Sequence, residues 1–523
     1  MRAWLDDQGE QPERPAPRVH RRGHWLDDDE PAASPTLPDG GPSPAPRGRF
    51  ELADDTLLPF DHDKATEPAA ESDDAAARLG LDDGDAANHG WAVGLCVAGG
   101  FAVATMLASG IATGDSELVA ATFIAAALAT LSISIFKRLA KADGAPELTV
   151  ILSASLSLKL LGTLARFYVG TSVYDRSDAS EYDLYGRKWA ADYLSQGTLP
   201  NVNKWTSTNF VRIVTAEFYH YTTPTKIGGF VFFSWIGLMG LLLFARGFRR
   251  VFPEAQRRYL LLVMFAPSLM YWPSSIGKEA LAIFGLGLAT YGVALMLTNA
   301  TIIGAVCIAG GIIEVTYVRT HVAMVVTVAM TIALLLRKRK GVKASGTVAT
   351  FFLLITLGSF VLTQANDYFG TNLLDGTSAV TDEFDAAQDR TEQGGSQFTP
   401  APAWNFPMRA ITVLFRPLPV EATSPQELVT SVESFAYAIA LAIAGRRLLK
   451  SIRRDYAYAI FAIVAVVFFV IVFGNFANFG ILARQRTQIL PFLFILLSMP
   501  ERPKPVKYTS IMQRRFELDP ESV

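Results

Sequence analysis

Residues 457–474 read AYAIFAIVAVVFFVIVFG, an uninterrupted apolar run without a charged residue. A helix needs roughly 20 mostly apolar residues to cross about 30 Å of membrane hydrocarbon, so this run predicts a membrane-spanning helix. The rest of the chain repeats the pattern, because 50% of its 523 residues are hydrophobic and they gather in long blocks. The sequence therefore predicts an all-α polytopic membrane protein.

The apolar runs predict about twelve transmembrane helices within a domain from residue 89 to 500. The runs are 91–112, 117–136, 147–168, 227–247, 257–273, 279–298, 301–317, 321–336, 346–364, 432–449, 457–474 and 483–499. Two long polar stretches, 170–226 and 365–431, interrupt them. Each stretch is long enough to form a small surface subdomain.

The two ends of the chain differ from this apolar core. Residues 1–88 are rich in Asp, Glu, Pro and Ala and lack a periodic apolar pattern, which predicts a disordered tail. Residues 501–523 form a second polar tail. The formal net charge of −2 does not suggest a nucleic acid partner. Cys96 and Cys307 lie in separate apolar runs, so we expect neither a disulfide framework nor a thiolate metal site.

Basic residues predict the orientation of the spans, because short cytoplasmic loops retain Lys and Arg. Clusters follow the second, fourth, eighth and tenth runs: Lys137-Arg138 with Lys141, Arg246 with Arg249-Arg250 and Arg257-Arg258, Arg337-Lys338-Arg339-Lys340, and Arg446-Arg447 with Arg453-Arg454. All of these runs are even-numbered, so one topology satisfies every cluster. It predicts a multi-pass protein of the cell membrane with both termini in the cytoplasm and both long loops outside.

Several basic residues fall on the external side in this topology, where the positive-inside rule does not place them. They stand in short motifs: Lys278 in WPSSIGKEA, Arg319 and His321 in YVRTH, Arg416 in LFRPLPVEA, and Arg484 and Arg486 in ILARQRTQ. A guanidinium matches phosphate geometry bidentately. If these side chains converge, we expect them to hold a phosphate or pyrophosphate group at the membrane surface.

The alternative for each cation is an ion pair with a carboxylate of the chain, which leaves nothing to bind a ligand. The pairs that the sequence suggests are Lys278 with Glu279, Arg416 with Glu421 and, between two spans, Lys159 with Glu314.

The first external loop contains the acidic segment YDRSDASEYDLYG, with Asp178, Glu181 and Asp183 close together. If this segment is helical, Asp178, Glu181 and Tyr185 lie on one face. Carboxylates that converge suit a general base or hold a divalent cation, whereas a solvated acidic loop would have neither role. No metal box, catalytic triad pattern, phosphate loop or dinucleotide motif is visible, so we expect no cofactor beyond an optional divalent cation.

The topology, the acidic DASEYDLYG segment and the external basic motifs together resemble the polytopic membrane glycosyltransferases of the GT-C type. The same features resemble the related polysaccharide polymerases, and both groups use polyprenyl-phosphate-linked sugars. The resemblance implies that Asp178 is the catalytic base, with Glu181 and Asp183 as substitutes, and that WPSSIGKEA, YVRTH and ARQR hold lipid phosphate. The chain departs from the family pattern because its acidic loop follows the third span instead of the first.

The resemblance implies a glycosyltransferase of cell-envelope polysaccharide or glycolipid assembly. Its partners would be a lipid-linked sugar donor, a glycan or lipid acceptor and membrane lipids. Two alternatives remain open, a transporter or flippase for a lipid-linked glycan and a non-catalytic membrane protein of envelope assembly. About twelve spans is also a transporter layout, although no internal repeat is visible.

Overall fold

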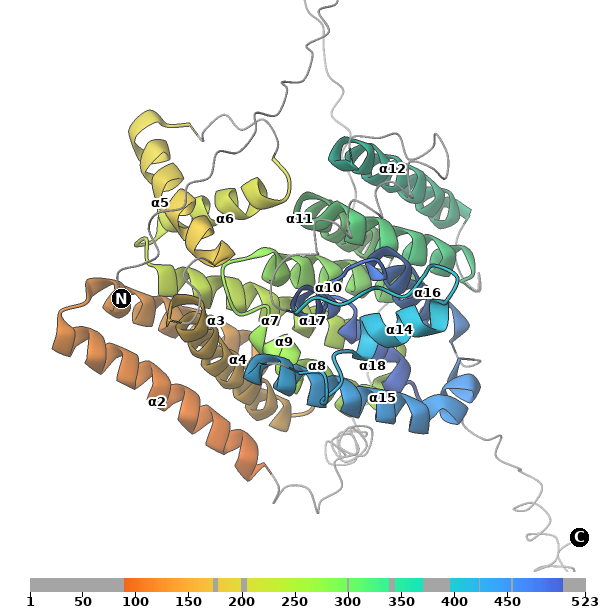
Figure 1. The fold of residues 1–523 in the computed structure, drawn as a ribbon, viewed down its shortest axis with the longest axis horizontal. Helices are drawn as coiled ribbons and strands as arrows, with labels where there is room; N and C mark the ends of the chain where they lie inside the picture. Colours follow the sequence, from red (N-terminus) through yellow and green to blue (C-terminus); the bar gives the residue numbers. More distant parts are fainter. Residues whose placement is uncertain are drawn as a thin grey trace, which may run out of the picture. The chain divides into compact units, whose positions relative to one another are not determined.

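The computed structural model describes residues 89–172, 177–198, 205–298, 301–337, 344–369, 396–422, 424–452 and 455–501 (Figure 1). The predicted N-terminal tail, nearly all of the C-terminal tail and the acidic middle of the second long loop lie outside these residues. Within them, the all-α prediction is confirmed, because the elements are helices and no strand is present. One isolated bridge joins Gln397 and Asn478.

The helices include long apolar rods and several short pieces. They are α2 (Gly90–Thr113), α3 (Ser116–Asp143), α4 (Glu147–Ser172), α5 (Asp178–Gln196), α6 (Thr208–Tyr221), α7 (Lys226–Val251), the short 3-10 turn η2 (Pro253–Ala255), α8 (Gln256–Phe265), α9 (Pro267–Tyr271), α10 (Lys278–Leu297), α11 (Thr301–Leu335), α12 (Ala344–Phe369), α14 (Phe406–Phe415), α15 (Pro425–Ser451), α16 (Tyr456–Phe473), α17 (Phe479–Arg486) and α18 (Leu490–Ser498).

In the described part of the chain, nine helices are long and apolar enough to cross a membrane, so the predicted count of twelve is not confirmed. Two predicted runs form short helices instead of one long helix. The run 257–273 is divided into α8 and α9 at Ala266, whose backbone is extended because Pro267 follows it. The run 483–499 is divided between α17 and α18, and Pro491 lies in the first turn of α18.

Two other predicted runs, 301–317 and 321–336, join into the single helix α11. Its helical course is interrupted at Arg319, where φ is −150° and ψ is 84°. The predicted boundary between the two runs therefore survives as a kink. The kink matters for the site, because Arg319 bonds residues of α10 and α17 there.

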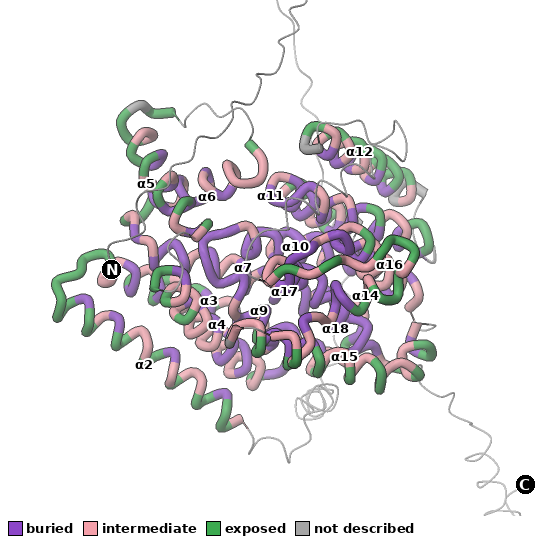
Figure 2. Tube along the Cα trace, in the orientation of Figure 1, coloured by how far each residue is buried: buried purple, intermediate pink, exposed green. Residues whose placement is uncertain are grey.

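The core lies where α7, α10 and α11 pack, and Figure 2 shows these helices as largely buried. Glycines bring α7 and α10 together. A Cβ at Gly287 of α10 would lie 2.2 Å from the carbonyl oxygen of Gly240 of α7, so the two backbones touch there. Close approach through small residues is typical of helices packed inside a membrane.

The helices around this core expose apolar side chains. Phe101 of α2, Phe123 of α3 and Phe352 of α12 are 72%, 66% and 63% exposed. Apolar faces of this extent suit contact with hydrocarbon, since a lipid environment carries no cost for them. The apolar helices and their exposed faces are together those of a membrane-embedded protein.

Candidate functional site

Glu279 is the centre of a buried ion network at the start of α10. It is only 2% exposed, and it accepts hydrogen bonds from Arg319 at the kink of α11 and from Arg484 of α17. Arg484 binds it bidentately, with Nε 2.6 Å from Oε1 and a terminal nitrogen 3.1 Å from Oε2. Two guanidinium groups compensate the burial of this carboxylate, which would otherwise be costly.

Local structure holds these partners in place. Gly277 precedes α10, so Glu279 lies in the first turn of the helix, where the helix dipole favours a negative charge. The side chain of Asn478 caps α17 by accepting a hydrogen bond from Ile481 N at 3.1 Å. Arg319 donates at 2.5 Å to Gln485, the neighbour of Arg484. The kink of α11, the start of α10 and α17 are therefore tied together.

Asp178, in the first of the two long loops, joins this network. Ser177 caps α5, so the helix begins at Asp178, and the acidic segment is helical from that residue onward. A terminal nitrogen of Arg484 donates to Asp178 Oδ2 at 2.9 Å. The Asp178 side chain nevertheless stays 58% exposed, so Arg484 leaves much of the carboxylate accessible.

The other two predicted carboxylates do not converge with Asp178. Glu181 pairs with Arg212 of α6, and that guanidinium also lies 3.8 Å from the ring centre of Tyr185. Asp183 is buried, where it accepts from Arg187 Nε at 3.1 Å and from the hydroxyl of Tyr219 at 2.6 Å. The three carboxylates therefore have separate partners, and Glu181 and Asp183 hold α5 against α6 through Arg212 and Tyr219.

Tyr182 of α5 is a buried aromatic residue close to Asp178 and Glu279. Its side chain is 3% exposed. Burial, together with the negative charges of Asp178 and Glu279, raises the pKa of Tyr182 to about 12. Its phenol therefore stays neutral at physiological pH and adds no charge beside Asp178.

The basic residues predicted to bind phosphate are also dispersed, apart from Arg319 and Arg484. Lys278 donates to Ser207 Oγ at 2.9 Å, so its expected pairing with the adjacent Glu279 is replaced by Arg319 and Arg484. His321 packs against the ring of Phe473, with 5.4 Å between ring centres.

Arg416 and Arg486 both have structural partners near the end of the second long loop. The predicted pair of Arg416 with Glu421 is present, with Arg416 Nε 3.0 Å from Oε1. That hydrogen bond lowers the pKa of Glu421, so the pair is charged at neutral pH. Arg486 is 2% exposed and donates to the carbonyls of Val413 and Arg416 and to Ser434. Its donors tie α14 to α15 and are not directed to a ligand.

The expected ion pair between Lys159 and Glu314 is wrong. Lys159 of α4 is 1% exposed, and its amine donates to the carbonyl of Leu269 in α9 at 2.8 Å. Glu314 lies instead against Gly285 of α10. The buried lysine is bonded to a backbone carbonyl of another helix, and the spacing of residues in the sequence does not predict such a partner.

Arg166, near the outer end of α4 in the predicted topology, is a site residue that the sequence analysis missed. Its guanidinium carbon lies 5.2 Å from the ring centre of Tyr271 and 4.9 Å from that of Trp272. Among the described residues it has no carboxylate partner, and its side-chain hydrogen bond goes to the hydroxyl of Tyr271 at 3.4 Å. The available signal was an arginine inside an apolar span, which by itself marks a functional candidate.

Three cavities adjoin around these residues, because each shares lining residues with the next, and we call them together the Arg166 cleft. The first, of about 180 Å³, is lined by Asp178, Ser275, Arg166 and Arg484. The second, of about 440 Å³, shares Arg166 and Arg484 with the first and extends past Asn478 and Pro417. The third, of about 470 Å³, shares Trp272, Ser424, Gln426 and Thr430 with the second.

The two ends of the Arg166 cleft differ in character. One end holds the exposed Asp178 carboxylate and the two arginines. The other end is mainly apolar and runs between α4, α9 and α15, along Val169, Pro267 and Val429. A ligand that carries an anionic group next to a hydrocarbon tail matches both ends at once.

Among the described residues, no group of three or more His, Cys, Asp or Glu side chains is placed to hold a metal ion. Comparisons with known proteins give no further guide: no family model, no curated protein and no solved structure matches this chain significantly.

Proposed function

We propose that this protein is a membrane glycosyltransferase that takes a sugar from a polyprenyl-phosphate carrier at the external face of the cell membrane. The observation that carries the proposal is the Arg166 cleft, which joins an exposed carboxylate and two arginines to an apolar groove between helices. A polyprenyl-linked sugar has the same order of parts: sugar, phosphate, hydrocarbon.

The proposed chemistry assigns one role to each polar group. Asp178 removes the proton from an acceptor hydroxyl, whose oxygen forms a bond to the anomeric carbon of the sugar. The bond from that carbon to the carrier phosphate breaks, and the phosphate leaves with the electron pair. Arg166 and Arg484 stabilise the negative charge that develops on the leaving phosphate. The reaction needs no nucleotide, because the carrier phosphate is already a leaving group.

Arg484 connects the proposed base to the proposed phosphate site. In the structure it bonds Asp178, and it also lines the cavity that would hold the phosphate. We propose that the incoming phosphate takes over the nitrogen that bonds Asp178. The bond from Arg484 to the buried Glu279 remains and keeps the guanidinium in position. An Asp178 oxygen is then free to accept the proton of the acceptor hydroxyl while the donor is bound.

The proposal includes the twelve-crossing topology with both termini in the cytoplasm. In this topology the two halves of α11, which the non-helical backbone of Arg319 divides, are two separate crossings. The pairs α8 with α9 and α17 with α18 supply two more crossings as broken helices. Broken helices occur inside membranes where neighbouring protein satisfies the backbone.

Sugar transfer in proteoliposomes tests this proposal. Purified protein is supplied with a polyprenyl-phosphate sugar and a glycan acceptor, and product and carrier phosphate are measured together. We expect Asp178→Asn to abolish both, whereas Glu181→Gln, on the same helix and 52% exposed at its side chain, retains them. Movement of the intact donor across the bilayer without any product would instead identify a flippase, and neither activity would indicate an assembly protein.

A further inference from the structure

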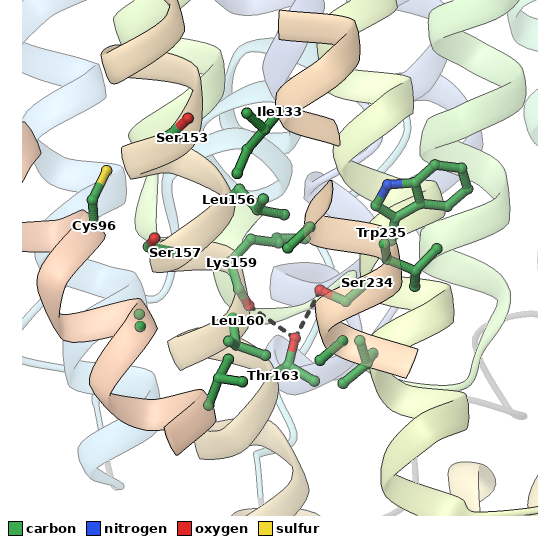
Figure 3. A pocket seen from close by; sticks show the side chains of 17 residues that line it. Cys96, Ile133, Ser153, Leu156, Ser157, Lys159, Leu160, Thr163, Ser234 and Trp235 are labelled. Carbon is green, nitrogen blue, oxygen red and sulfur yellow. Dashed lines mark hydrogen bonds between the residues drawn. The ribbon is translucent and has the colours of Figure 1, made fainter. Parts of the chain in front are cut away.

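A separate cavity of about 230 Å³ lies between α2, α3, α4 and α7 (Figure 3). Small residues create it, since Gly99 and Gly100 of α2 face Ala125 and Ala129 of α3 across the space. At Gly99 the helices α2 and α4 touch, because a Cβ there would lie 2.4 Å from Ser157 Oγ. One position further on, a Cβ at Gly100 would meet no atom within 4 Å.

Four polar residues in the wall of this cavity, Lys159, Thr163, Ser234 and Trp235, have hydrogen-bond partners in the protein. Figure 3 shows Thr163 between the carbonyl of Lys159, at 2.8 Å, and the hydroxyl of Ser234, at 2.7 Å. Trp235 donates from Nε1 to Ser132 Oγ at 2.9 Å. The amine of Lys159 is bonded to the carbonyl of Leu269 in α9. The space itself is therefore faced mainly by hydrocarbon, which comes from Val103, Leu128, Ile133, Leu156, Leu160 and Val231.

The position of the cavity determines what can fill it. All four helices are candidate membrane spans, and the lining residues come from the middle parts of α2, α3 and α4 and from the first half of α7. Gly100 lines the cavity and is exposed, so the cavity opens on the outer surface of the helices. Water is a poor occupant, because a buried water needs polar partners. An empty space would forfeit dispersion contacts along its whole wall.

We propose that this cavity binds an acyl chain of a membrane phospholipid, which enters between α2 and α3 past Gly100. The site is separate from the Arg166 cleft, and the binding does not depend on glycosyl transfer. The two sites share the helix α4, which contributes Leu160 and Thr163 to the acyl-chain cavity and Arg166 to the cleft. A bound chain stabilises the folded bundle by mass action and packs against α4 next to Lys159, which bonds α9.

Photolabelling in a bilayer tests the proposal. The protein is reconstituted in vesicles of phosphatidylethanolamine and phosphatidylglycerol that contain phosphatidylglycerol with a diazirine in its acyl chain. Adducts are then located by mass spectrometry. Lipids around the protein label exposed residues such as Phe352 of α12, whereas Val231, which is 7% exposed, is reached only from inside the cavity. We expect adducts at Val231 and Leu160 in addition to those at Phe352.

Two filled variants and two matched controls decide the outcome. Gly100→Leu and Ala129→Leu place extra carbon in the cavity and should reduce the adducts at Val231 and Leu160 to background. Gly94→Leu and Ala127→Leu add the same side chain to exposed positions of the same two helices outside the cavity lining and should leave these adducts unchanged. Labelling at Phe352 should be equal in all five proteins. Absence of adducts at Val231 in the unmodified protein, or equal adducts in the filled variants, would overturn the proposal.

Discussion

Asp178 of α5 and Arg484 of α17 are 306 positions apart in the chain, and a hydrogen bond of 2.9 Å joins them. The same guanidinium binds the buried Glu279 of α10. One arginine thus connects the exposed Asp178 carboxylate of the first long loop to the buried Glu279 of the bundle. The link makes Arg484 the residue on which both the stability and the proposed chemistry of the site depend.

Replacement of Arg484 should therefore destabilise the fold as well as remove activity. Arg484→Ala leaves Glu279 buried with half of its compensation, and breaking a buried pair in this way costs about 3–5 kcal/mol. Thermal unfolding in detergent measures the loss. Arg212→Ala is the matched control, because its partner Glu181 is largely exposed and such pairs contribute about 0–1 kcal/mol. An equal loss of stability in the two variants would show that Arg484 does not compensate the buried charge of Glu279.

Replacement of Arg166 by alanine should remove activity but cause little loss of stability. Among the described residues it pairs with no carboxylate, so Arg166→Ala leaves no buried charge without a partner. We expect sugar transfer to fall roughly 10²-fold or more, as when one transition-state donor is removed. Arg416→Ala is the control, since Arg416 pairs with Glu421 and does not line the cleft. Normal transfer by Arg166→Ala, or an equal defect in both variants, would contradict the assignment of phosphate binding to Arg166.

Asp183 should behave as a structural residue. Asp183→Asn weakens its bond to Arg187 and disturbs the buried bond from the hydroxyl of Tyr219, at a cost of about 1–3 kcal/mol. The melting temperature should fall, while transfer measured well below that temperature stays near normal. Tyr219→Phe should lower the melting temperature in the same direction. A stable Asp183→Asn protein that has lost transfer would instead place Asp183 in the reaction.

The orientation can be measured with cysteines in a background where Cys96 and Cys307 are replaced by serine. Leu184 of α5, in the first long loop, is 65% exposed, and Lys450 lies near the end of α15, close to Arg446 and Arg447. Each is replaced by cysteine in turn. An impermeant maleimide should label the first variant in intact cells and the second only after permeabilisation. The reverse pattern would place Asp178 in the cytoplasm and remove the external site.

Much of the fold was predictable because hydropathy acts over whole helices. The apolar runs give the spans, and Ser177 at the start of the acidic segment fits the observed beginning of α5 at Asp178. The breaks were harder to predict. Pro267 interrupts one run and Arg319 bends another, and hydropathy averaged over a span hides a single residue of either kind.

The site was only partly predictable, because it depends on pairings across long sequence distances. Asp178, Glu279, Arg319 and Arg484 do meet, and they come from four different elements. Arg486 has the same local signal as Arg484, two positions away, but it points into carbonyls of the second loop. Arg166 was hidden in an apolar run, and only the packing of Tyr271 and Trp272 beside it reveals the cleft.

The most direct measurement is a cryo-EM structure of the protein with a non-reactive polyprenyl-phosphate sugar analogue in a lipid nanodisc. The account predicts phosphate density within hydrogen-bonding distance of Arg166 and Arg484, the sugar beside Asp178, and the hydrocarbon tail between α4, α9 and α15. Density for the analogue elsewhere, or an unchanged bond from Arg484 to Asp178 with the phosphate distant from Arg166, would contradict it.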